Sequence, residues 1–378
     1  MVAFAQEGVG TSDSGQITAS SVVMQEDYSV GVNADGEGNS VTVEGDVTIT
    51  GDYSEGVQAW QGGSVNVSGN ITTTGKNSSA VDIWGENSQV TVGGDITAFG
   101  DGSNGVFMYG DGSQITDGGN ITVTDESDDT SWADSYGILA DLNSQAVVDG
   151  SVSSKNGSAI QTFDRASVTV KGDVSSAGDS RSTVSAQNDS SVTIWGNVYS
   201  EGDSGWGIFT SGGGDGKRVP LVDIKGDVIV TGDLLCNSEI DYPVDAEGVN
   251  AGGASIVNID GNVSSAKGRA VSATLEATVN IGGNVAAGEN DYFSCPGVRA
   301  DNNAKVNVSG NVTGGVDTEN SATVRVGGDV FGVKGTGVRA VGGSTVIVEG
   351  TVNGTSWADG YELMVFPHKV DAQLVLIK

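Results

Sequence analysis

The chain consists of short stretches in which Val or Ile alternates with a polar or small residue. Each stretch ends at a Gly that is followed by Asp or Asn, as in SVTVEGDVTITGD at 40–52 and SVTVKGDVSSAGD at 167–179. Alternation over four or five positions puts the apolar side chains on one face of a strand, so it predicts strands rather than helices. Gly-Asp and Gly-Asn corners tolerate the backbone angles that tight turns need. We therefore expect an all-β protein of short strands and tight corners.

The stretch recurs along nearly the whole chain. Its spacing runs from 18 to 35 residues and is mostly 22–25. The anchoring glycines are Gly45, Gly69, Gly94, Gly119, Gly150, Gly172, Gly196, Gly226, Gly261, Gly283, Gly310, Gly328 and Gly350. A repeat of this length is typical of a solenoid, in which one unit buries its apolar side chains only against the next.

Each unit predicts three strands. The first contains V-x-V and ends at the anchoring Gly, the second begins straight after Asp or Asn, and the third reads G-V-x-A, as at 56–59. Three strands and three corners make one triangular coil. The predicted fold is an all-β, parallel, three-faced β-helix of about 13 coils. We expect a right-handed helix, because the strict hexapeptide repeat of left-handed β-helices is absent.

These patterns predict three regions. Residues 1–14 contain Ala3-Phe4-Ala5, which fits the end of a secretory signal peptide, and we assign them to a leader and cap. Residues 15–363 form the β-helix. Residues 364–378 form a C-terminal cap or the start of a following domain.

The charge of the chain excludes one class of partner. It carries 17 Lys and Arg against 49 Asp and Glu, a net charge of −32. Nucleic-acid binding needs clustered Lys and Arg, so we expect no such partner. No apolar run approaches the ~20 residues of a membrane-spanning helix, so we expect no membrane insertion. We favour a monomer.

The repeated V-x-V-x-G-D/N-V-x-I units resemble the parallel β-helices of bacterial surface proteins, including adhesins and autotransporter passengers. They resemble the pectate-lyase-like superfamily more distantly. The resemblance covers residues from about 15 to 360. It implies a secreted or cell-surface protein, most often a binding or structural rod without a cofactor. The chain has no translocator barrel and no sorting motif, so its mode of attachment stays open.

Six aromatic residues recur at or beside the outward positions of the third strand. They are Trp60, Trp84, Tyr109, Phe163, Phe107 and Phe209. Stacked coils would align them as an aromatic ladder. Exposed aromatic faces suit sugar rings or apolar peptide surface. Alternatively, the rings only stack on one another and cover the corner.

The predicted corner between the second and third strands carries four long insertions. They are residues 125–136, 232–247, 288–296 and 354–361. Two of them share the phrase TSWAD-x-Y, with Trp132 and Tyr136 in one copy and Trp357 and Tyr361 in the other. Either each Trp packs over its own corner, or the loops form a paired binding edge.

The same insertions contain both cysteines, Cys236 and Cys295. Secretion would favour a disulfide between them, and the alternative is two unrelated thiols. One insertion is also acidic, with Asp125, Glu126, Asp128 and Asp129. Calcium prefers several oxygen ligands, but a solvated run of charge explains the loop equally simply. The Asp and Asn residues at the corners interchange freely, which favours turn formation over calcium binding.

The sequence predicts no catalytic residue. The one histidine, His368, lies beyond the repeat, and no Ser-His-Asp set, metal-ligand spacing or phosphate loop occurs. Arg299 and Arg339 occupy equivalent outward positions and form the most basic spot. The leading hypothesis is a non-catalytic surface or secreted rod that binds glycan or a host or bacterial surface protein. Because Asp is abundant, a polysaccharide lyase or glycoside hydrolase remains the alternative, and a passive spacer is the third.

Overall fold

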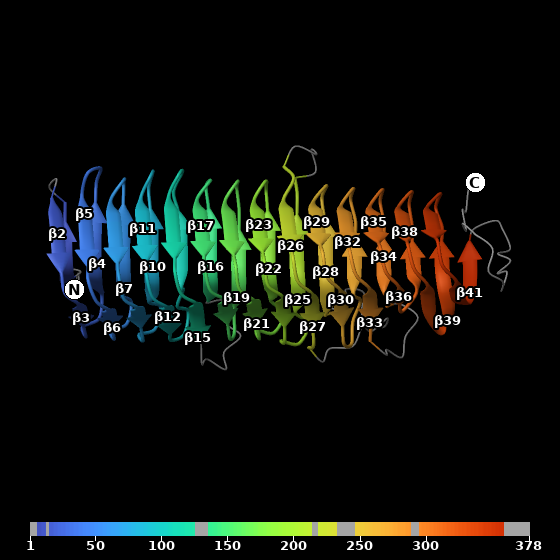
Figure 1. Cartoon of the computed structure of the whole chain (residues 1–378), viewed down its shortest axis with the longest axis horizontal. Coiled ribbons are helices and arrows are strands. Elements are labelled where there is room, and N and C mark those ends of the chain that lie inside the picture. Colours follow the sequence, from blue (N-terminus) through green and yellow to red (C-terminus); the bar gives the residue numbers. More distant parts are fainter. Residues whose placement is uncertain are drawn as a thin grey trace. The chain divides into compact units, whose positions relative to one another are not determined.

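The computed structural model describes residues 6–12, 15–124, 135–213, 218–232, 246–288 and 295–358. All regular elements in these ranges are strands, so they contain no helix that could cross a membrane. The chain divides into two units. Unit 1 comprises residues 1–178 and 190–195, and unit 2 comprises residues 179–189 and 196–378. Within each unit, successive turns of the chain place equivalent strands side by side on three faces (Figure 1).

Unit 1 builds its three faces from strands that pair in parallel with the equivalent strand of the next turn. The first face contains β2 (Gln16–Ala19), β5 (Ser40–Val43), β8 (Ser64–Val67), β11 (Gln89–Val92), β14 (Gln114–Asp117), β17 (Gln145–Val148), β20 (Ser167–Val170) and β23 (Ser191–Ile194). The second contains β3 (Val22–Met24), β6 (Val47–Ile49), β9 (Ile71–Thr73), β12 (Ile96–Phe99), β15 (Ile121–Thr124), β18 (Val152–Ser154) and β21 (Val174–Ser176). The third contains β1 (Gln6–Thr11), β4 (Ser29–Asp35), β7 (Glu55–Trp60), β10 (Ser79–Trp84), β13 (Val106–Tyr109), β16 (Tyr136–Asp141) and β19 (Ser158–Thr162).

Unit 2 repeats this arrangement. Its first face contains β26 (Leu221–Ile224), β29 (Ile256–Ile259), β32 (Thr278–Ile281), β35 (Lys305–Val308), β38 (Thr323–Val326) and β40 (Thr345–Val348). Its second contains β24 (Val198–Ser200), β27 (Val228–Val230), β30 (Val263–Ser265), β33 (Val285–Ala287) and β36 (Val312–Thr313). Its third contains β22 (Ser182–Gln187), β25 (Trp206–Ser211), β28 (Glu247–Gly252), β31 (Val271–Ala273), β34 (Val298–Ala300) and β37 (Val316–Thr318). Two long strands, β39 (Val330–Ala340) and β41 (Val352–Ala358), run through both the second and the third face.

The alternation seen in the sequence decides which side chains are buried. In β5, Val41 and Val43 are buried while Ser40 and Thr42 are half-exposed. The same pattern recurs in the other first-face strands, and in-register pairing stacks each buried Val or Ile on its equivalent in the next turn. Each fully buried Val or Ile stabilises the fold by roughly 1.5–3 kcal/mol. The predicted fold class is thereby confirmed, with about 13 turns in the two units taken together.

Paired strands continue to both ends of the described residues. Strand β1 pairs in register with β4, inside the range 1–14. The prediction that 354–361 is an inserted loop is wrong for residues 355–358, which belong to β41 and pair with β39, Trp357 lying opposite Arg339. The reason is that β39 continues from the second into the third face without a break and offers β41 a long partner. Residues 364–378 lie outside the described residues.

Candidate functional site

The third face of unit 1 carries a row of aromatic rings. Strands β7, β10 and β13 pair in register, so Trp60, Trp84 and Tyr109 lie opposite one another on successive strands. Ring centroids are 6.3 Å apart for Trp60 and Trp84 and 5.3 Å apart for Trp84 and Tyr109. Phe107 lies on the same face, 5.4 Å from Trp84. These four residues are the aromatic platform.

The platform follows from local sequence and strand spacing. In β7, Val57 and Ala59 point into the core, so Gln58 and Trp60 point outward. The next strands repeat this alternation with Trp84 and Tyr109 at the equivalent position. Neighbouring strands lie ~4.8 Å apart, so outward rings at one register position contact each other. Contact among the rings leaves Trp60 37 % and Tyr109 42 % exposed.

An acidic residue ends the row on each side. In register, Asp35 of β4 lies opposite Trp60, and Asp141 of β16 lies opposite Tyr109. Both are half-buried. Burial raises the pKa of Asp141, which the backbone N–H of Leu142 partly offsets. The row thus consists of three aromatic rings with one carboxyl group at each end. It combines an apolar surface with hydrogen-bond acceptors at its ends.

A second pair of carboxyl groups, Glu55 and Asp82, lies beside the rings on β7 and β10. Asp82 is only 9 % exposed and sits between Gln58 and Phe107 of the neighbouring strands. Glu55 and Trp84 are its nearest polar neighbours, and both influence its pKa. Burial, with the charge of Glu55 as the second cause, raises the pKa of Asp82 to about 8. Burial also raises the pKa of Glu55, which accepts a hydrogen bond of 2.6 Å from Gln58.

These shifts define the protonation of the pair. A carboxyl group with a pKa near 8 is mostly protonated at pH 7, so Asp82 is the member of the pair that holds a proton. The raised pKa values of both groups lower the negative charge of the pair near neutral pH.

Unit 2 contains the same motif with a different partner. Glu247 occupies the position of Glu55 in β28, and Asn250 donates a hydrogen bond of 2.7 Å to it, as Gln58 does to Glu55. Here Arg269 donates to Glu247 at 3.0 Å, and both side chains are buried. In unit 1, Ser79 lies opposite Glu55 in register. The partner of Glu247 is therefore a cation, Arg269, whereas the partner of Glu55 is a second carboxyl group, Asp82.

Glu55 and Asp82 influence each other's pKa, so the two carboxyl groups lie near each other beside the rings. The described residues contain no group of three or more His, Cys, Asp or Glu arranged for a metal ion. The arrangement is suited to stacking and hydrogen bonding.

Two residues predicted for the ladder lie apart from the platform. Phe163 follows β19, where it lies beyond Asp141 in the row, and it is half-buried. Phe209 belongs to β25 of unit 2, where its ring lies 5.6 Å from that of Trp206. The structure thus brings together four of the six predicted aromatic residues.

Most of the predicted loop edge falls outside the described residues. This holds for Trp132, Tyr361 and the acidic residues Asp125, Glu126, Asp128 and Asp129. Tyr136 is the first residue of β16, and its backbone N–H donates to Asn104 at 3.1 Å. Cys295 is buried and disulfide-bonded. Its predicted partner, Cys236, lies outside the described residues, so the pairing stays a prediction.

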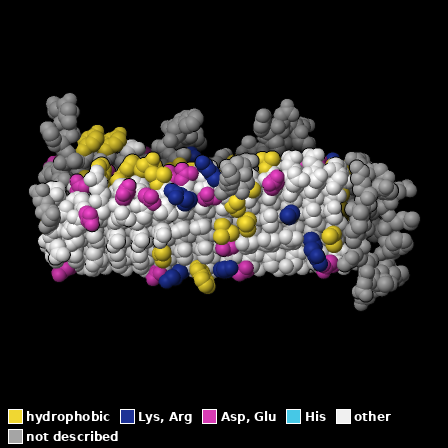
Figure 2. All heavy atoms as spheres, turned by 90° about the horizontal axis from the view of Figure 1, so that it is seen from above, with side chains coloured by type: hydrophobic (Ala, Val, Ile, Leu, Met, Phe, Trp, Pro, Cys, Tyr) yellow, Lys and Arg dark blue, Asp and Glu magenta, His cyan; other side chains and the backbone are white. Residues whose placement is uncertain are grey.

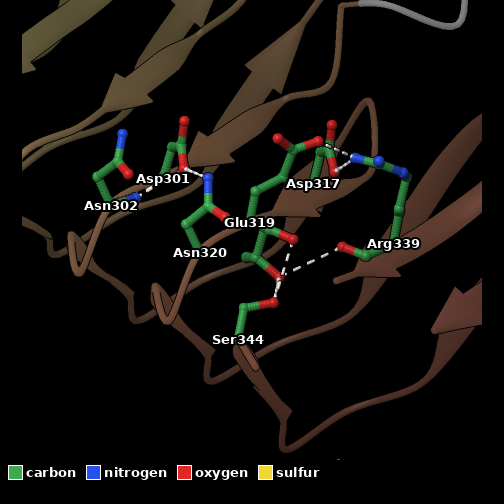
Figure 3. Close-up of polar contacts among 8 residues, drawn as sticks. Asp301, Asn302, Asp317, Glu319, Asn320, Arg339 and Ser344 are labelled. Carbon is green, nitrogen blue, oxygen red and sulfur yellow. Dashed lines mark hydrogen bonds and ion pairs between the residues drawn. The ribbon is translucent and has the colours of Figure 1, made fainter. Parts of the chain in front are cut away.

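The basic spot predicted in unit 2 is neutralised by acidic neighbours. Asp317 of β37 lies opposite both Arg299 and Arg339 in register. Figure 3 shows the guanidinium of Arg339 between two carboxylates, 2.7 Å from Asp317 and in contact with Glu319. Ion pairs of this kind lower the attraction of the surface for an acidic ligand.

The corner Asp and Asn residues form a ladder within the fold. The Oδ1 atoms of Asp46, Asn70 and Asp95 each accept a backbone N–H from the equivalent corner of the next turn, at 2.8 Å. Unit 2 contains the same bonds, for example from Asn284 to Asn262 at 2.9 Å. Either side chain can serve because each offers the same acceptor, which agrees with the predicted turn role.

Sequence reasoning missed three features of unit 1. The Glu55–Asp82 pair is one, and the shared phrases EGVQA and EGVNA were the available signal. The second is Asp117, which is fully buried where neighbouring turns have Val92 and Val148. The third is the exposed pair Tyr28 and Tyr53, whose rings stack 5.2 Å apart. On the face drawn in Figure 2, both acidic and basic side chains lie near the exposed hydrophobic side chains.

Comparisons of the chain with known protein families, with curated proteins and with solved structures found no match. Its function must therefore be argued from the site itself.

Proposed function

We propose that the protein is a non-catalytic, extracellular glycan-binding solenoid, secreted or attached to a bacterial surface, and that the aromatic platform is its binding site. The observation that carries this proposal is the register row of Trp60, Trp84 and Tyr109, whose outer two rings are exposed. The extracellular and bacterial parts rest on the resemblance of the repeat alone.

The chemistry of the row suits a sugar chain. The apolar faces of sugar rings pack on aromatic rings, and their hydroxyl groups need hydrogen-bond partners at the edges of the contact. Asp35 and Asp141 supply acceptors at the two ends of the row, and Gln58 supplies a donor and an acceptor beside it. An apolar protein surface would gain less from these polar groups, because each would have to be desolvated without a partner.

The test is binding of the full chain to a panel of soluble polysaccharides, with Trp84→Ala and Trp60→Ala as variants. An aromatic contact contributes on the order of 1–2 kcal/mol, so each variant should bind about 5- to 30-fold more weakly. Trp195→Ala is the matched control, since Trp195 is 61 % exposed and follows β23, on the first face. It should bind as the wild type does.

Three results would contradict the proposal. Polysaccharide binding that is equal in wild type, Trp84→Ala and Trp60→Ala would remove the platform as the site. Release of reducing or unsaturated ends from a bound polysaccharide would show that the protein is an enzyme. Platform-dependent binding of a protein, with no glycan bound, would replace the ligand class.

A further inference from the structure

We infer that the platform binds polysaccharides that lack acidic groups and rejects polyanionic ones, a selectivity that the carboxylates of Asp35 and Asp141 at the ends of the row impose. This inference rests on the proposed function and adds the class of ligand to it. The site would thus exclude polyuronates and sulfated chains, which an aromatic row alone would accept.

The first argument is the charge of the site. The five strands that carry the row, β4, β7, β10, β13 and β16, read SVGVNAD, EGVQAW, SAVDIW, VFMY and YGILAD. Together they contain four carboxyl groups, namely Asp35, Glu55, Asp82 and Asp141, and no Lys or Arg. The nearest preceding cation, Lys76 at the turn before β10, is already paired with Asp101 at 2.9 Å.

The second argument is where these groups lie. Asp35 and Asp141 end the row in register with its rings, so a chain that covers the three rings reaches both carboxylates. A hydroxyl group at either end can donate a hydrogen bond to a carboxylate. A carboxylate or sulfate of the ligand can only accept, and it would lie close to a like charge.

The third argument is the buried pair under the platform. The Asp82 Oδ1 atom is buried without a partner of normal hydrogen-bond geometry in the described part of the chain, and Asp82 is more than nine-tenths buried. Gln58, Phe107, Trp84 and Glu55 surround it, and none of them is a cation. An anionic ligand therefore finds no countercharge beneath the rings either.

The test compares matched pairs of polysaccharides that share a backbone and differ in charge. Suitable pairs are hydroxyethyl and carboxymethyl cellulose, and methyl-esterified and de-esterified homogalacturonan. For each backbone that the wild type binds through Trp84, the anionic member should bind about tenfold or more weakly at low salt. The gap should shrink at about 1 M salt, where the Debye length falls to ~3 Å.

A double variant tests the cause. Asp35→Asn/Asp141→Asn keeps the size of both side chains and removes their charges, and should bring the affinities for the two members several-fold closer. Trp60→Ala replaces Trp84→Ala as the platform variant if the latter lowers the melting temperature.

The outcomes separate this inference from the proposed function. An anionic member that binds as tightly as its neutral partner, and loses affinity in Trp84→Ala, overturns the selectivity while the platform stands. An unchanged preference in the double variant overturns the role of Asp35 and Asp141. If no polysaccharide of any pair binds in a way that depends on Trp84 or Trp60, the proposed function is overturned, and the inference with it.

Discussion

The guanidinium of Arg269 donates a hydrogen bond of 3.0 Å to the carboxylate of Glu247, and less than a tenth of each side chain is exposed. At the equivalent position of unit 1, the uncharged Ser79 lies opposite Glu55. The two units therefore solve the same problem, a half-buried or buried glutamate on the third face, in two ways. Unit 2 pairs it with a cation, and unit 1 places it beside Asp82, a second carboxyl group that holds a proton at neutral pH.

Removal of Arg269 should destabilise unit 2. Arg269→Met leaves Glu247 as a buried charge without its cation, which costs about 3–5 kcal/mol of unfolding free energy. In the double variant Arg269→Met/Glu247→Gln no charge is buried, so most of this loss should be recovered. Urea unfolding of the wild type, both single variants and the double variant measures the coupling between the two residues. Equal destabilisation in Arg269→Met and in the double variant would mean that packing, not charge, is what Arg269 provides.

Asp82→Asn should stabilise the protein increasingly as pH rises. The pKa of Asp82 is raised in the folded state, from 3.8 to about 8, so the folded protein binds more protons than the unfolded chain between these values. Stability attributable to Asp82 therefore falls as pH rises from about 4 to 8 and is level above that. Asn does not titrate. The difference in unfolding free energy between variant and wild type should be smallest near pH 4 and largest at pH 8–9.

The control for this experiment is Asp317→Asn, at a half-buried outward position of β37 whose carboxylate is 2.7 Å from Arg339. It removes a carboxylate that faces a cation, so it should not gain stability with rising pH. A pH-independent difference between Asp82→Asn and wild type would contradict a raised pKa of Asp82.

The buried carboxyl group of Asp117 should also make the protein less stable as pH rises, without a second carboxyl group as its partner. Burial raises its pKa to about 7, assisted by the charges of Asp95 and Asp149 and partly offset by the backbone of Gly119. The folded state thus resists ionisation, and stability falls as pH rises from about 4 to 7. By linkage this amounts to on the order of 4 kcal/mol, which Asp117→Asn should regain above pH 7. Asp117→Val should stabilise further, because it restores the residue type found at Val92 and Val148.

Thermal unfolding between pH 4 and pH 9 measures this effect. Val92→Leu, at the equivalent position one turn away, is the control and should shift stability equally at every pH. An Asp117→Asn variant that is no more stable than the wild type at pH 8 would mean that the carboxylate is solvated or paired.

The repeat made the fold and the aromatic row predictable. In-register stacking converts a recurring sequence position into a spatial row, so Trp60, Trp84 and Tyr109 could be aligned without a structure. The acidic pair could not be found in this way. Asp82 is one of many outward acidic residues, but it is buried, and large aromatic side chains, Trp84 and Phe107, lie on its own and the neighbouring strand. Its burial depends on side chains of neighbouring turns, and these turns differ in sequence at the positions concerned.

The wrong prediction for residues 355–358 has a different cause. Residues 355–358 repeat a phrase found in a predicted insertion, and the repeated phrase suggested the same structure. The neighbouring strand decides otherwise, because β39 continues through the corner and pairs with β41 over two faces. The partner strand therefore determines the structure of residues 355–358 more than their local sequence does. This agrees with the dependence of strand formation on context.

Asn70 tests whether the corner residues build turns or bind calcium. Its Oδ1 accepts the backbone N–H of Asp95, and its own N–H donates to Asp46, both at 2.8 Å. Asn70→Asp keeps the acceptor and should change the unfolding free energy by less than about 0.5 kcal/mol, whereas Asn70→Ala should cost about 1 kcal/mol. The melting temperature of the wild type should be the same in EDTA and in calcium. If calcium raised the melting temperature and Asn70→Ala abolished this effect, the ladder would bind the ion. An acceptor that bonds only to a backbone N–H would not make the melting temperature depend on calcium.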